Sequence, residues 1–238
     1  MNPHPSSYLR GAAILFVGGW VTFWAGAVNP AAWQFFTSAS LQEFLKIVAT
    51  HEIAWLCIAG SFALGVLLTL AGFIVLGAAL HTAGDQIWSG LGQSAFLFGS
   101  VLWLACLAFR VTATVSAARV TASSGEVPPW FEPMRDWASA LFAIHMVLAY
   151  LAIAAYGKAL LATDIAPRWL AWTHLLFGLL GVVGFIARFP LFNPPLMIHL
   201  IPGIFGVVVL MRMRGVKPLH QQHRQTEPES AGAVNDEE

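Results

Sequence analysis

Long apolar segments constrain this chain more than any other feature of its sequence. Six can be drawn, and most have the roughly 20 residues that a helix needs to cross about 30 Å of hydrocarbon. They are Leu9–Val28, Ile53–Leu80, Trp88–Arg110, Trp137–Lys158, Trp169–Ala187 and Leu196–Met211. A segment that crosses lipid must satisfy its backbone polar groups internally, so we expect helices. The sequence therefore predicts an all-α, polytopic transmembrane helical bundle of about six spans.

The shortage of charged residues supports this prediction. Only 10% of the 238 residues are charged, whereas soluble domains average about 25%. The 12 basic and 12 acidic residues give a net charge of zero, so nothing favours a nucleic-acid partner. The expected partners are the lipid bilayer and another membrane protein or a second copy of the chain.

Polar segments set the predicted organisation. Residues 1–211 are expected to form the transmembrane domain, and residues 212–238, which are poor in apolar side chains, a disordered cytoplasmic tail. Ser40 and Glu43 fit a capping box in front of an apolar stripe, which predicts a short interfacial helix after the first span. The alternative is that this helix is the start of the second span, extended into water. A cluster of prolines predicts a loop over residues 121–136, folded back onto the membrane surface.

Basic residues in the short loops predict the orientation. With six spans, both termini lie on one side, and that side receives the cluster Arg212, Arg214, Lys217 and Arg224. Lysine and arginine accumulate in cytoplasmic loops. We therefore expect both the N- and the C-terminus to be cytoplasmic.

Ionisable residues inside apolar spans are the first functional candidates, because their burial in hydrocarbon costs several kcal/mol. His145 and His199 come out at comparable depth, where neutral imidazoles could ligate a haem or a metal. The alternative is that each histidine hydrogen-bonds a neighbouring helix. The histidines are single and scattered, without a Cys-x-x-Cys-His or His-Glu-x-x-His motif. We therefore predict no cofactor, and haem b remains an alternative.

A second candidate is a polar pocket on the side away from the termini. His51, Glu52 and Arg110, together with His145, could bind a small ligand, a quinone head or an ion. The alternative is that side chains at span ends extend to water. The ligand-binding candidates are thus His51, Glu52, Arg110, His145 and His199, and metal ligands stay unassigned.

No catalytic residue is predicted, because no Ser-His-Asp order, nucleotide-binding glycine loop or carboxylate pair occurs. Glycines such as Gly65, Gly178 and Gly181 permit close helix packing. The leading hypothesis is a non-enzymatic membrane protein that acts by helix packing or by binding a small apolar ligand. The alternatives are a haem- or quinone-binding redox protein using His145 and His199, and a small-solute transporter. The lack of a mid-membrane carboxylate or an internal repeat disfavours the transporter.

The C-terminal half carries a family resemblance. It contains Arg135-Asp136-Trp137, then Ile165-Ala166-Pro167-Arg168, then Pro202-Gly203. This order resembles an uncharacterised family of small bacterial multispan membrane proteins, catalogued as a domain of unknown function. The resemblance covers about the last 100 residues, implies a helical bundle in the bacterial inner membrane, and transfers no activity.

Overall fold

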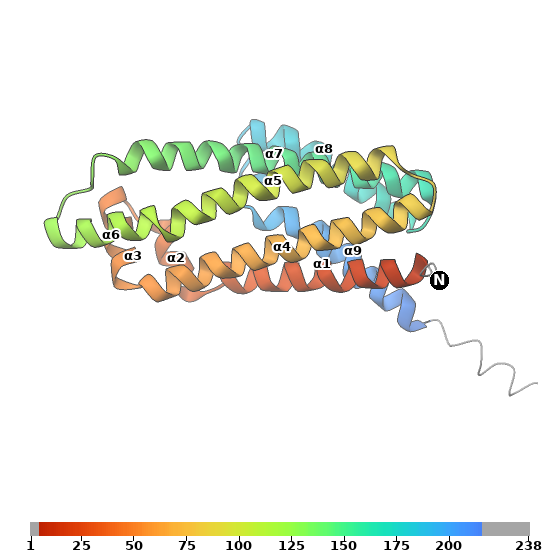
Figure 1. The fold of residues 1–238 in the computed structure, drawn as a ribbon, viewed down its shortest axis with the longest axis horizontal. Helices are drawn as coiled ribbons and strands as arrows, with labels where there is room; N and C mark the ends of the chain where they lie inside the picture. Colours follow the sequence, from red (N-terminus) through yellow and green to blue (C-terminus); the bar gives the residue numbers. More distant parts are fainter. Residues whose placement is uncertain (1–4, 216–238) are drawn as a thin grey trace, which may run out of the picture.

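The computed structural model describes residues 5–215, and this part of the chain is all-α (Figure 1). Its elements are α1 (Pro5–Ala27), α2 (Pro30–Thr37), α3 (Leu41–Thr50), α4 (Glu52–Thr82), α5 (Ile87–Val111), α6 (Ala113–Ser124), α7 (Phe131–Thr163), α8 (Arg168–Ile186), the short turn η1 (Pro190–Phe192) and α9 (Leu196–Gly215). No strand occurs within residues 5–215. The predicted all-α helical bundle is confirmed.

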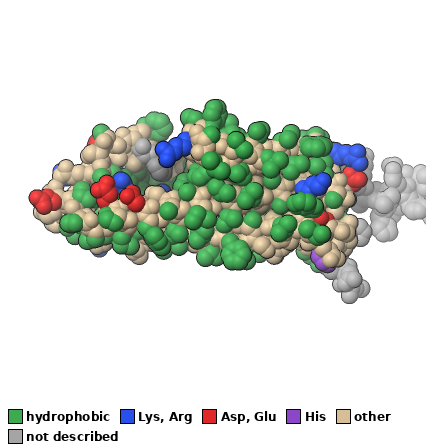
Figure 2. Space-filling view, turned by 90° about the horizontal axis from the view of Figure 1, so that it is seen from above, with side chains coloured by type: hydrophobic (Ala, Val, Ile, Leu, Met, Phe, Trp, Pro, Cys, Tyr) green, Lys and Arg blue, Asp and Glu red, His purple; other side chains and the backbone are tan. Residues whose placement is uncertain are grey.

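Six helical segments of the described chain are long and apolar enough to cross a membrane. They are Ser6–Ala27, Glu52–Thr82, Ile87–Ser124, Phe131–Thr163, Arg168–Ile186 and Leu196–Arg214. Figure 2 shows apolar side chains along the middle of the molecule and charged side chains gathered toward its two ends. This surface is the one expected of a multi-pass membrane protein.

The spanning helices form two layers of three. In the first layer α1 packs between α4 and α9, and in the second α7 packs between α5 and α8. The turn at residues 83–86 joins α4 to α5 and so connects the layers at one edge (Figure 1). Contacts between α7 and α9, at the other edge, are few. We call the surface where the two layers meet the seam.

Small residues bring the helices of each layer close together, as the sequence predicted. A Cβ added at Gly178 of α8 would collide with the backbone of Ala154 in α7. A Cβ at Gly65 of α4 would meet Gly19 and Phe23 of α1. These helices approach at distances that only glycine permits, which favours tight backbone packing in lipid.

Several spanning helices are longer than a membrane requires. The ends that extend beyond it pack against short helices, and together they form a structure that we call the cap. At 1.5 Å per residue, the 31 residues of α4 extend about 46 Å, against about 30 Å of hydrocarbon. The cap consists of α2, α3, α6 and the first turns of α7, at the end of the bundle away from the N-terminus (Figure 1). It is built on a core that includes Phe35, Leu45, Trp55, Phe109 and Phe131.

The cap corrects one prediction. Residues 121–136 are not one loop, because α6 continues to Ser124 and α7 begins at Phe131. Pro133 fits the first turn of α7, where backbone N–H groups have no helical partner in any case. The short helix expected after the first span is α3, and a second helix that was not predicted, α2, precedes it.

Of the two hydrogen bonds of the predicted capping box, the one that Ser40 accepts is confirmed. The Glu43 N–H donates to Ser40 Oγ at 3.1 Å, as expected. The Glu43 carboxylate accepts from the Ala39 N–H at 2.8 Å, one residue before the predicted partner. At the other end of the chain α9 continues to Gly215, past the expected start of the tail, and the rest of the predicted tail lies outside the described residues.

Candidate functional site

A cleft opens between the cap and the spanning helices. A cavity of about 210 Å³ is lined by Phe44, Trp55, Phe109, Arg110, Thr114, Phe131, Arg135 and Ser139. A second cavity of about 340 Å³ shares Phe44 and Arg135 with the first and is otherwise lined by residues 38–41. We call the two adjoining cavities the cleft. Aromatic rings form half of the lining of the smaller cavity, whereas the larger cavity has Phe44 as its one ring, and the charged side chains of the cleft are both arginines.

Arg110 lies at the inner end of the cleft, in the last turn of α5. Its guanidinium carbon lies 5.9 Å from the centre of the Trp55 ring and 5.7 Å from that of Trp103. The Trp55 indole N–H also donates to the Arg110 carbonyl at 2.9 Å, which fixes the ring beside the side chain. Ring faces attract a cation by about 0.5–2 kcal/mol, but they do not neutralise it.

The charge of Arg110 is otherwise uncompensated. Over residues 5–215, the ion pairs join Arg119 to Glu52, Arg135 to Glu132 and Arg168 to Asp164, and none includes Arg110. The side chain is half-buried, so water screens it incompletely. An anion that enters the cleft would therefore meet a cation held in place by two indole rings.

His145 and His199 lie deeper, at the seam, and both are buried. His145 Nδ1 is 2.9 Å from the Gly99 carbonyl oxygen, which can only accept, so Nδ1 carries the proton. Thr69 Oγ1 donates to the Gly65 carbonyl and is 2.9 Å from His199 Nδ1, so His199 Nδ1 also donates. In the neutral side chains both Nε2 atoms are therefore unprotonated, and each carries a free lone pair.

Neither lone pair has a hydrogen-bond partner in the described part of the chain. The two imidazoles come from opposite layers, His145 from α7 and His199 from α9. Five further buried groups lack partners within residues 5–215: the indole N–H groups of Trp20, Trp24 and Trp103, and the hydroxyls of Ser100 and Thr121. Each such group costs about 1–3 kcal/mol. All of them except Thr121, which belongs to α6, lie on the same helix turns as the residues that contact the two histidines.

Stacked rings connect the cleft to the histidine pair. On one side the Trp103 ring, over which Arg110 lies, stacks on His145 at 5.3 Å between centroids. On the other side Phe62 stacks on Phe23 at 4.5 Å, and Phe23 stacks on His199 at 4.1 Å. A small cavity of about 10 Å³ lined by Trp55, Phe62 and Arg110 lies between the cleft and this second stack.

The nitrogen atoms of His145 and His199 are suitable ligands for a haem iron, but the closed seam leaves no space for the macrocycle. A haem supplies four nitrogens to its iron and takes two axial ligands, and metal-bound histidines usually donate their other N–H to a protein oxygen. His145 and His199 meet the second condition, because each Nδ1–H is bonded to a protein oxygen. Each Nε2, however, exposes less than 1 Å², so no void as large as a water molecule adjoins it. A macrocycle could enter only if α7 and α9 moved apart.

The structure brings together only part of the group that the sequence selected. Arg110 lines the cleft and lies over the Trp103 ring, which in turn stacks on His145. His51 is exposed at the junction of α3 and α4. Glu52 accepts from Arg119 Nε at 3.0 Å and from Nη2 at 2.6 Å, on the outside of the cap.

Sequence reasoning missed the aromatic walls of the cleft and the hydroxyl that holds His199. Phe44, Phe109 and Phe131 come from three elements that are adjacent only in the folded cap, so no local pattern marks them. Thr69 did carry a signal, because it is the only hydroxyl between Ala63 and Leu80.

No group of three or more His, Cys, Asp or Glu side chains in the described chain could hold a metal ion by itself. No model of a protein family, no curated protein and no solved structure matches this chain. The family resemblance of the C-terminal half therefore stays a prediction.

Proposed function

We propose that this chain is a membrane-embedded binding protein whose cleft holds a small amphiphilic anion, such as a carboxylate or a phosphate on an apolar body. The observation that carries the proposal is the position of Arg110. It is a half-buried cation at the inner end of an aromatic cavity, with no carboxylate within 4.0 Å in residues 5–215. A bound anion would complete this site.

Each wall of the cleft has a role in this proposal. The rings of Phe44, Phe109 and Phe131 would pack against the apolar body of the ligand. Arg110 and Arg135 would hold the anionic group by charge-assisted hydrogen bonds, which are about twice as strong as neutral ones. The cavity that contains Arg110 measures about 210 Å³, below the range of about 300–1,000 Å³ typical of small-molecule sites, and the adjoining cavity of about 340 Å³ falls within that range.

Ligand-dependent thermal unfolding of the purified protein tests the proposal. A ligand that binds only the folded state stabilises it in proportion to the logarithm of its concentration. Decanoate is expected to raise the unfolding temperature, whereas decanol, which has the same chain length and no charge, is not. The shift should disappear in Arg110→Ala and persist in the control Arg168→Gln, whose side chain is exposed beside Asp164. Equal shifts in both variants would refute the proposal.

A second candidate function, a haem-binding redox protein, is favoured by the bare Nε2 atoms of His145 and His199. It requires the seam to open. For this function, an absorption spectrum of the purified protein, before and after dithionite, would have to show a Soret band that shifts on reduction. The band should be lost in His145→Ala and in His199→Ala. A wild-type spectrum without a Soret band would eliminate this candidate.

A further inference from the structure

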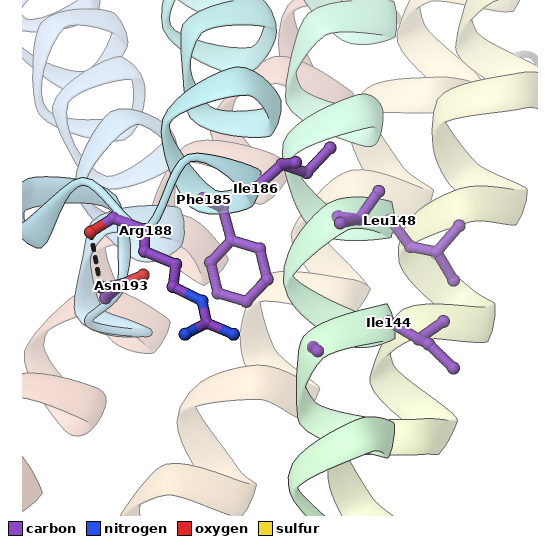
Figure 3. A pocket seen from close by; sticks show the side chains of 8 residues that line it. Ile144, Leu148, Phe185, Ile186, Arg188 and Asn193 are labelled. Carbon is purple, nitrogen blue, oxygen red and sulfur yellow. Dashed lines mark hydrogen bonds between the residues drawn. The ribbon is translucent and has the colours of Figure 1, made fainter.

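An apolar groove runs along the lipid-facing side of α7 and α8, apart from the cleft. Its volume is about 640 Å³, and its walls are Ala143, Ile144, Val147, Leu148, Phe185 and Ile186. Arg188 and Asn193 line the same groove. Figure 3 shows Arg188 and Phe185 extending from the end of α8 and the turn that follows it, into the space beside α7.

Arg188 occupies a backbone position that glycine would fill more easily. Its φ is 56°, in the left-handed region, one residue past the C-cap of α8. The Phe189 N–H donates to the Gly184 carbonyl at 2.7 Å and the Arg188 N–H to the Phe185 carbonyl at 3.0 Å. These two bonds form the helix ending that usually carries a glycine at this position. The backbone conformation therefore gives no reason for an arginine at this position. We infer that the side chain itself has a role.

The Arg188 guanidinium is exposed and forms no ion pair within residues 5–215. The 19 residues of α8 extend about 28 Å, close to the hydrocarbon thickness, so the guanidinium lies where lipid headgroups begin. Phe189 and Leu191, on the same turn, are at least half exposed and suit the membrane interface. Asn193 adds an amide 3.5 Å from the Arg188 carbonyl (Figure 3).

We propose that this groove is a binding site for one phospholipid, with its phosphate on Arg188 and Asn193 and an acyl chain along Ile144, Leu148 and Ile186. Charge complementarity selects the occupant, because a guanidinium pairs with phosphate in a planar, two-pronged geometry. The apolar walls next to it match a hydrocarbon chain. A soluble phosphate would use the charged end of the groove alone and would leave these walls uncovered.

Native mass spectrometry of the protein, purified in a mild detergent with added phosphatidylglycerol, tests the site. Wild type is expected to retain one lipid. Arg188→Gly, which relieves the backbone, should fold and retain at least fivefold less. The control Arg168→Gln, at the opposite end of α8, should retain as much as wild type. Equal retention by Arg188→Gly and wild type would overturn the proposal.

The apolar half of the site needs its own variant. Ile186→Ser removes part of the groove wall and leaves both polar residues in place, so lipid retention is expected to fall about threefold. Glycerol phosphate, which has the headgroup chemistry without acyl chains, should not displace the lipid at millimolar concentration. Full displacement by glycerol phosphate would show a phosphate site rather than a lipid site, and would contradict the proposal.

Discussion

Arg110 and Arg188 lie at helix ends on the cap-facing half of the molecule, and neither has an acidic partner in the described chain. Their surroundings differ. Arg110 is half-buried, in helical backbone, beside two indole rings that face a protein cavity. Arg188 is exposed, in left-handed backbone, at a groove that faces lipid. The comparison teaches that an unpaired arginine in a membrane protein is explained by what lies next to it, here aromatic rings in one case and an apolar groove in the other.

The largest expected difference between the two arginines is in ligand binding. Arg110→Ala should weaken decanoate binding at least tenfold, or about 1.4 kcal/mol, because hydrogen bonds to charged groups contribute about 1.5–3 kcal/mol. Arg188→Ala should leave decanoate affinity unchanged. Isothermal titration of both variants measures this. Equal losses in the two would mean that the cleft and the groove are not independent sites.

The same substitution should change stability in opposite directions at the two positions. Arg188→Gly is expected to raise the free energy of unfolding by about 1 kcal/mol, since left-handed backbone costs about that much for other residues. Arg110→Gly should lower it by a similar amount, because glycine destabilises a helix by about 0.5–1 kcal/mol. Chemical denaturation of both variants in detergent compares them. A loss of stability in Arg188→Gly would remove the argument from backbone strain.

Salt should separate the two sites by a smaller factor. Raising the ionic strength from about 0.1 M to 1 M shortens the screening length from about 10 Å to 3 Å. Lipid retention at the exposed Arg188 is expected to fall severalfold, whereas decanoate binding at the sheltered Arg110 should change less than about twofold. Parallel titrations at the two ionic strengths provide the measurement. The reverse order would contradict the assigned burial of the sites.

The smallest effect is expected for Arg119, which has an acidic partner. Its ion pair with Glu52 is exposed, and exposed pairs contribute little to stability because water and salt screen them. Arg119→Gln should therefore lower the free energy of unfolding only slightly and leave both binding reactions unchanged. Thermal unfolding with and without decanoate tests this. A change in decanoate affinity would show that the cap surface contributes to the cleft.

The spanning helices were predictable from the sequence because apolar length alone specifies them. The predicted span Ile53–Leu80 corresponds to the helix Glu52–Thr82, and the predicted span Trp88–Arg110 corresponds to the helix Ile87–Val111. The cap was not predictable in the same way. Most buried positions of α6 are small or hydroxyl-bearing, such as Thr114, Ala117 and Thr121, and α6 packs mainly against α3. A pattern that depends on a distant helix leaves little signal in its own segment.

The candidate site was predictable in its charged and imidazole groups but not in its connections. Arg110, His145 and His199 stand out because such residues are rare in apolar segments. That Glu52 pairs with Arg119 rather than with Arg110 depends on how α4 and α6 meet in the cap. The bare Nε2 atoms could not be foreseen either, because they follow from the hydrogen bonds of Gly99 and Thr69.

The uneven contact between the two layers has a mechanical consequence. The backbones of α7 and α9 come close at few positions, although side chains of both helices belong to one buried core, whereas the α4–α5 hairpin joins the two layers covalently at the opposite edge. We therefore expect the softest motion of the bundle to be a rotation of one layer about that hairpin. Hydrogen exchange should accordingly be faster on the seam-facing side of α9 than in the α4–α5 hairpin.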